Sequence, residues 1–344
     1  ITVFGILFSH NILALMNTKD ELIDGAVLYL RIYLLGMPAL GLYNFGNAVL
    51  SAAGDTKRPL YYLAFAGVVN VILNLFFVIV CHLGVAGVAL ASMISQFISA
   101  FLILRALLTG KEKYCLRLSE IRFDKRKAVG ILQIGIPSAF QYSLFAFANL
   151  FVQSSVNSFD HILVEGNSAA ANADPLVYDM MAAFYTACSS FIAQNFGARK
   201  KKRILQTYLI CLFYSFITSL VLGVGIYLAR YPFLYLFTSD KAVVEAGITR
   251  LSIMALSYSA SAFMDASIAA SRGLGKTAVP TFVVVMGSCV FRIIWIYTIF
   301  AYFHTIQSLY ILYVFSWGIT AIAENIYFFH VYRHTLTGKT ESHL

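Results

Sequence analysis

Charge is scarce in this chain of 344 residues. Asp, Glu, Lys and Arg make up only 12% of it, whereas 60% of the residues are apolar. A water-soluble globule of this length needs more polar side chains to cover its surface, so the composition excludes that class of protein. Most of the surface must face hydrocarbon, and the lipid bilayer is the first partner that the sequence predicts.

Catalytic and metal-binding motifs are lacking as well. The sequence contains no P-loop and no nucleophile elbow, and its five cysteines include no CxxC pair. His330 and His334 have HxxxH spacing without an intervening Glu, so a solvated helix end explains them. We therefore expect no enzyme and no metal or cofactor, and we expect any transport to be driven by an ion gradient. A membrane enzyme is the weaker alternative.

Long apolar windows occupy most of the chain. A helix crosses the hydrocarbon core with roughly 20 residues, and the windows lack the two-residue alternation of an outer-membrane barrel. We therefore predict an all-α polytopic membrane protein with nine complete spans and the end of another at 1–16. The nine windows lie near residues 26–50, 60–82, 84–108, 130–157, 176–196, 206–230, 245–270, 280–303 and 306–332.

Lys and Arg are distributed unevenly between the two sides of this topology. One side holds 19 of the 25, including the basic stretch at 111–127 and the run at 199–203, whereas the loop at 158–175 on the other side holds none. Because basic residues are retained in the cytoplasm, we predict a cytoplasmic C-terminus in the cell (inner) membrane. The formal charge of +9 fits this sidedness and an anionic leaflet better than nucleic-acid binding.

One loop recurs 221 positions further along the chain. The hexapeptide GDTKRP, from Gly54 to Pro59, falls on GKTAVP, from Gly275 to Pro280. Gly, Thr and Pro match at once, so we interpret these four named residues as structural positions of two equivalent loops. Internal repeats of this kind are typical of transporters.

The same offset pairs four spans with four others and leaves the spans at 130–157 and 176–196 without partners. Their counterparts would begin about ninety positions before residue 1. We therefore expect an N-terminally truncated fragment of a protein with two six-span lobes, related by a pseudo-twofold axis along the membrane normal. The predicted domains are a partial N-lobe at 1–108, a basic cytoplasmic linker at 109–128, a C-lobe at 129–333 and a cytoplasmic tail at 334–344.

Several short motifs follow one another in the order of a known family. They are GDTKRP followed by Asn70 and Asn74, GVAGVALASMISQ at 84–96, GIP at 135–137 and IAQNFGARKKKR at 192–203. Over nearly its whole length the chain resembles the multidrug and toxic compound extrusion (MATE) transporters. The resemblance implies two pseudo-symmetric six-helix lobes, the first incomplete here, that exchange H⁺ or Na⁺ influx for drug export by alternating access. We expect a monomer.

An ionisable side chain inside a span is a candidate for the coupling ion, because burying it is costly. Asp265 follows Ser257 and Ser261 at four-residue steps, which places all three on one helix face. Arg292 lies mid-span and always carries charge, so we expect it to pair with Asp265 or Glu324. A purely structural pairing is the alternative for both carboxylates. The resemblance leaves H⁺ and Na⁺ open as the coupling ion and favours H⁺.

Amide and aromatic side chains at helical spacing mark the predicted substrate cavity. Such side chains suit small amphipathic cations, which they hold by hydrogen bonds and cation–π contacts. The alternative is that the amides join helices to one another. The candidates are Asn70, Asn74, Gln141, Phe145, Asn149, Gln153 and Ser261.

Two other functions are compatible with the sequence. The first is a flippase for lipid-linked saccharides or lipids of the same superfamily. Its cavity should be richer in Arg and Lys, whereas Arg292 is the only basic residue that we place well inside a span. The second, from a different class, is a receptor or scaffold membrane protein with no transport cycle.

Overall fold

A computed structural model describes residues 2–15, 20–109 and 115–335, and every regular element in these ranges is helical. The chain divides into two compact units, residues 1–122 and 123–344. Parts of the predicted linker (110–114) and tail (336–344) lie outside the described residues. The first unit contains α1 (Thr2–Leu15), α2 (Asp20–Leu35), α3 (Met37–Ala52), α4 (Lys57–Leu75), η1 (Phe76–Val80), α5 (Gly84–Thr109) and η2 (Leu118–Glu120). The second contains α6 (Lys125–Val156), α7 (His161–Ala171), α8 (Ala173–Gly197), α9 (Lys201–Leu228), α10 (Arg230–Tyr235), α11 (Lys241–Gly273), α12 (Ala278–Val284), η3 (Val285–Val290), α13 (Phe291–Trp295), η4 (Ile296–Phe300), α14 (Ala301–Phe303) and α15 (Ile306–His334).

The described helices confirm the predicted polytopic, all-α fold. Eight of them are long and apolar enough to cross a membrane. A ninth span results if Leu22–Leu35 and Met37–Ala52, bent by 41° at their junction, count as one. All nine predicted windows fall on these segments. The bend follows from the sequence, because Gly36 precedes α3 and a proline occupies its first turn.

The prediction of an outer loop at 158–175 is wrong, because most of these residues form the helix α7 (His161–Ala171). The carboxylate of Asp160 caps this helix by accepting a hydrogen bond from the backbone N of Leu163 at 2.9 Å. Small residues let α7 lie directly on α11: a Cβ added at Gly166 would come within 2.8 Å of the backbone N of Gly247. The polar composition of this stretch suggested a loop, but its small residues serve helix packing.

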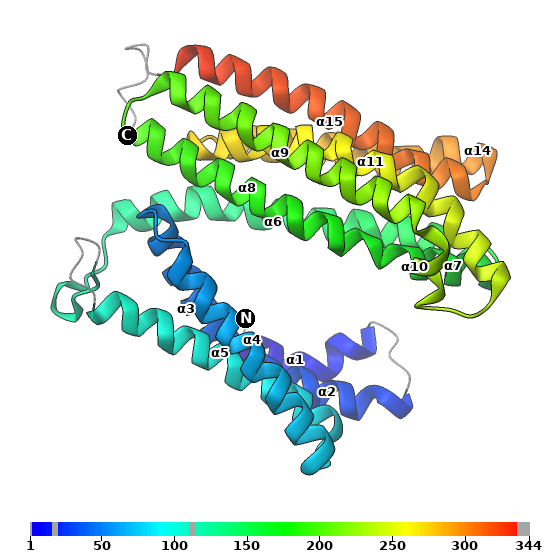
Figure 1. The fold of residues 1–344 in the computed structure, drawn as a ribbon, viewed down its shortest axis with the longest axis horizontal. Helices are drawn as coiled ribbons and strands as arrows, with labels where there is room; N and C mark the ends of the chain where they lie inside the picture. Colours follow the sequence, from blue (N-terminus) through cyan, green and yellow to red (C-terminus); the bar gives the residue numbers. More distant parts are fainter. Residues whose placement is uncertain (1, 16–19, 110–114, 336–344) are drawn as a thin grey trace. The chain divides into compact units, whose positions relative to one another are not determined.

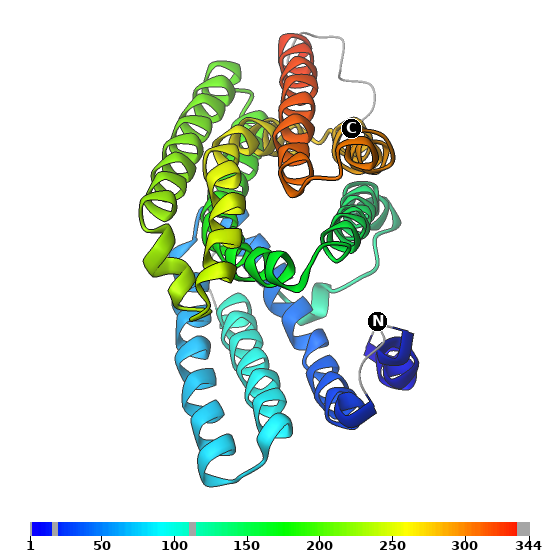
Figure 2. The same cartoon turned by 90° about the vertical axis from the view of Figure 1, so that its right-hand side faces the viewer.

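Helix α11 is the centre of the second unit. It packs against α7, α8, α9 and α15 (Figure 1), and 67% of its most apolar window is buried. Figure 2 shows the red helix α15 beside the orange span that runs from α12 to α14, and the two are in contact. The C-terminal half of α11 is rich in Ala, Ser and Gly, which allows neighbouring helices to approach closely.

The sequence repeat is visible in the backbone. Gly54 and Gly275 both adopt positive φ, +92° and +75°, a conformation that glycine adopts without steric cost. Each closes the preceding helix with the same pair of hydrogen bonds, the Schellman motif. Pro59 and Pro280 each occupy the third position of the next helix, where no intrahelical donor is required. The bonds are Gly54 N to Ser51 O (3.0 Å), Asp55 N to Leu50 O (2.9 Å), Gly275 N to Arg272 O (2.8 Å) and Lys276 N to Ser271 O (2.9 Å).

Candidate functional site

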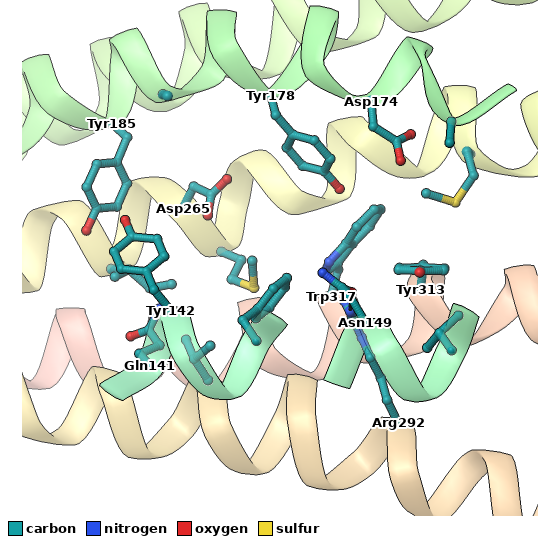
Figure 3. Close-up of a pocket in the computed structure, with 18 of the residues that line it drawn as sticks. Gln141, Tyr142, Asn149, Asp174, Tyr178, Tyr185, Asp265, Arg292, Tyr313 and Trp317 are labelled. Carbon is teal, nitrogen blue, oxygen red and sulfur yellow. Dashed lines mark hydrogen bonds between the residues drawn. The ribbon is translucent and has the colours of Figure 1, made fainter. Parts of the chain in front are cut away.

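The described part of the second unit encloses a cavity of about 660 Å³. Side chains of α6, α8, α11, α13 and α15 line most of it, and every lining residue belongs to this unit. Figure 3 shows tyrosine rings, one indole and several polar side chains converging on the space from opposite sides. A volume of this size is typical of small-molecule sites.

Helix α6 supplies one wall of the cavity. It begins after Asp124, whose carboxylate accepts hydrogen bonds from the backbone N of the second and third residues of the helix. All four predicted residues of α6 line the cavity, because four-residue steps keep them on one helix face. They are Gln141, Phe145, Asn149 and Gln153.

Arg292 on α13 does not form the ion pair predicted for it. The side chain is fully buried, and the described residues provide no carboxylate within ion-pair distance. Its Nη1 donates to Oδ1 of Asn149 at 2.8 Å and its Nε to Oγ of Ser316 at 3.3 Å. Its Cζ lies over the rings of Phe145 and Tyr313, 4.7 and 4.6 Å from their centroids. An amide, a hydroxyl and two π-faces thus take the place of the expected carboxylate.

Arg272 joins three helices at the cavity. From α11 its Nη1 donates to the hydroxyl of Tyr185 on α8 at 2.7 Å, and its Nη2 donates to Oε1 of Gln141 on α6 at 2.8 Å. We expected this residue outside the membrane, because it follows the apolar window. A long side chain can return its charged end toward a polar site, and that is what places Arg272 at the cavity.

A second missed element is an ion pair between α8 and α11. Arg250 donates from Nη2 to Oδ2 of Asp174 at 2.7 Å and from Nη1 to Oδ1 at 3.3 Å, and the Tyr258 hydroxyl also donates to Oδ1. Both charged residues line the cavity. The prediction that Arg292 alone is basic inside a span is therefore wrong. No local pattern connects residues 76 positions apart, so the sequence gives no signal for this pair.

Asp265 is the lining carboxylate without a protein partner. It lies half-buried on α11 between the tyrosines of α8 (Figure 3), and no hydrogen bond or ion pair links it to the residues that the structure describes. Ser257 and Ser261 on the same helix are buried, and their hydroxyls bond to backbone carbonyls of their own helix. Of this predicted polar stripe, Asp265 lines the cavity.

Glu324 on α15 occupies a different environment. The residue is fully buried, and neither carboxylate oxygen has a hydrogen-bond partner within 2–15, 20–109 and 115–335. It does not belong to the lining of the cavity described above. The two carboxylates considered for ion coupling therefore lie in separate places within one unit.

Asn70 and Asn74 belong to the first unit. Nδ2 of Asn74 donates to Oδ1 of Asn70 at 3.1 Å, and Nδ2 of Asn70 donates to Oγ of Ser95 on α5 at 3.4 Å. The second bond joins α4 to α5, and the first lies within α4. They correspond to the packing role that the sequence left open as the alternative.

Comparison with known proteins gives a consistent result. The MatE family model matches residues 1–76 and 137–298. The probable multidrug resistance protein YpnP of Bacillus subtilis is 33% identical over 201 residues, which are 58% of this chain and 44% of that protein. The probable multidrug resistance protein YoeA of the same organism is 28% identical over 267 residues, 75% of this chain and 57% of its own. The chain thus spans about half the length of these relatives.

A solved structure shares the fold. It is the outward-facing conformation of a multidrug resistance MATE family transporter of the MOP superfamily. It superimposes with a TM-score of 0.90 over 97% of this chain and 75% of its own, at 21% sequence identity.

Proposed function

The chain belongs to the MatE family of membrane transporters, and from this premise we propose that it exports small amphipathic molecules, in particular cations, in exchange for H⁺ or Na⁺. Alternating access of the cavity to the two sides of the membrane would drive the exchange. We also propose that the protein has no enzymatic activity, works as a monomer in the inner membrane with a cytoplasmic C-terminus, and uses no cofactor apart from the transported ion.

The observation that carries the proposal is Asp265 in an aromatic cavity. A carboxylate without a protein partner can attract the positive end of an amphipathic molecule, and the surrounding rings offer apolar and π surface to the rest of it. The same carboxylate can hold H⁺ or Na⁺. Substrate and coupling cation would then compete for one charge, which is what exchange requires.

Efflux from proteoliposomes tests this proposal. The full-length protein is reconstituted with a fluorescent amphipathic cation, and efflux is followed under an imposed pH or Na⁺ gradient. We expect Asp265→Asn to reduce gradient-driven efflux at least about tenfold, because the amide keeps the shape but not the charge. Asp240→Asn is the matched control, because Asp240 caps α11 outside the cavity. Wild-type protein that is folded yet inert under both gradients would contradict the proposal.

A second function is favoured by the arginines. Arg250, Arg272 and Arg292 all line the cavity, whereas the sequence suggested a single basic residue there. A flippase for anionic lipid-linked saccharides requires such a cavity. Transfer of a labelled anionic lipid between leaflets, in vesicles where the cationic probe shows no flux, would support the flippase over the exporter.

A further inference from the structure

Three helices of the second unit meet in an apolar layer next to the cavity. Ile268 of α11, Val284 of α12 and Ala321 of α15 belong to one buried cluster, here named the first apolar layer. A second apolar layer follows along α11 and α15, where Ala270, Leu274 and Phe328 share another buried cluster. Because the span that runs from α12 to α14 is joined to α11 and to α15 by short loops, α11 and α15 run in one direction and this span runs in the other.

Helical spacing from the first apolar layer brings together Ser271, Thr281 and Glu324, here named the polar layer. Each of its members is three residues away from a member of the first apolar layer, along its own helix and toward the same end of the unit. The steps are Ile268 to Ser271 on α11, Val284 to Thr281 on α12 and Ala321 to Glu324 on α15. Three residues are nearly one helical turn, so the three polar side chains face the same axis as the apolar ones.

The polar layer contains buried oxygen atoms without partners. Ser271 and Glu324 are fully buried and Thr281 is 7% exposed. Four of their atoms make no hydrogen bond with the described residues: Oγ of Ser271, Oγ1 of Thr281 and both Oε atoms of Glu324. Buried polar atoms are normally satisfied, and leaving a carboxylate unsatisfied is especially unfavourable. Four such atoms in one layer point to a ligand.

Arg272 directly follows Ser271 on α11, which brings a positive charge near Glu324. It does not neutralise the carboxylate by contact, because its terminal nitrogens are bonded to Tyr185 and Gln141 at the cavity. Its field partly opposes a second positive charge in the polar layer. A small monovalent ion is compatible with this environment, whereas a divalent ion would bring more charge than one carboxylate can balance.

We propose that the polar layer is a Na⁺ site, with Glu324 as the charged ligand and the hydroxyls of Ser271 and Thr281 as neutral ligands. A proton on Glu324 would provide one donor and leave other oxygens unsatisfied. All four oxygens can coordinate one hard cation at the same time. The inference rests on the proposed exchange function, and it names Na⁺ as a coupling ion held outside the substrate cavity.

Direct ion binding tests the site. The full-length protein is purified in a Na⁺-free choline buffer at fixed pH, and ²²Na⁺ binding is measured by scintillation proximity. We expect saturable binding in the wild type that unlabelled Na⁺ displaces. Glu324→Gln should weaken it at least about tenfold, since even outer-shell partners of a metal ion contribute this much. Glu245→Gln is the matched control, because Glu245 lies exposed on α11 and bonds only to Tyr231.

Two further variants keep the test valid if Glu324→Gln does not fold. Ser271→Ala and Thr281→Val retain shape and the carboxylate but remove one ligand each, and each should weaken Na⁺ binding severalfold. Unchanged binding in all three variants would overturn the proposal, as would a wild type that binds no ²²Na⁺. A wild type that binds no ²²Na⁺ while its efflux is still driven by a pH gradient would refute only this site. Intact Na⁺ binding without efflux of any probe would refute only the exchange function.

Discussion

The two repeats of this chain share a backbone but not its chemistry. The helix end at Gly54 and the one at Gly275 have the same positive φ and the same hydrogen bonds. Yet the charged cavity residues of the second repeat fall on uncharged residues of the first. At an offset of 221, Arg250, Asp265, Arg272 and Arg292 correspond to Tyr29, Asn44, Ser51 and Val71. The two copies therefore share the helix end, while these four positions are charged only in the second copy.

The polar layer shows the same difference. Ser271, Thr281 and Glu324 correspond at this offset to Leu50, Leu60 and Ile103. Leu50 is fully buried in the core of the first unit. At these three positions the first copy has apolar side chains, with Leu50 and Ile103 buried and Leu60 exposed. The second copy has oxygen atoms that lack partners among the described residues.

Introducing into α11 the proline that accompanies the bend in the first repeat should have the largest effect on stability. Pro38 lies at the bend between α2 and α3, and its equivalent in the continuous helix α11 is Ser259. A proline there clashes with the carbonyl of Ala255, which cannot move aside because Gly223 of α9 lies against it. We expect Ser259→Pro to lower the free energy of unfolding by about 3 kcal/mol or more.

Thermal unfolding in detergent measures this change. Ser259→Ala is the control, and it should cost under about 0.5 kcal/mol, because the exposed hydroxyl bonds only to a carbonyl of its own helix. A proline variant as stable as the wild type would mean that α11 bends as readily as its counterpart.

Replacing Glu324 of the polar layer by leucine should have an intermediate effect on the free energy of unfolding, and in the opposite direction. Without Na⁺, we expect Glu324→Leu to raise the free energy of unfolding by about 2 kcal/mol, since an uncompensated buried carboxyl is replaced by an apolar side chain. The same variant should lose Na⁺-dependent stabilisation. Unfolding curves in choline and sodium buffers measure both effects. Glu245→Leu, at an exposed position, should change neither, and a destabilised Glu324→Leu would show that the carboxyl has a structural partner.

The smallest effect concerns the two equivalent glycines. Gly54→Ala and Gly275→Ala should each cost about 1 kcal/mol, because alanine tolerates positive φ poorly while both sites have free space around the Cβ position. Asparagine, which adopts this conformation more easily, should cost less at both sites. Unfolding curves of the four variants measure the effects. Unequal costs at the two glycines would show that the repeat is only approximate.

Local patterns predicted the parts of the molecule that depend on local physics. Span positions follow from apolar length alone, and the turn at Gly54 follows from a short motif with a known backbone requirement. The contacts of Arg292 could not be predicted, because they depend on which side chains of α6 and α15 arrive at the same place. The ion pair between Asp174 and Arg250 could not be predicted for the same reason. The prediction of a loop at 158–175 failed because small polar residues are common to loops and to close helix contacts.

Helix α13 bears Arg292 immediately after the π-helical segment η3. A π-turn takes up one residue more than an α-turn, and one residue corresponds to about 100° of rotation around a helix axis. The extra residue in η3 therefore determines the direction in which the Arg292 side chain points from the helix axis. Shortening Val285–Val290 by one residue would rotate the guanidinium away from Asn149 although every residue lining the cavity stayed the same.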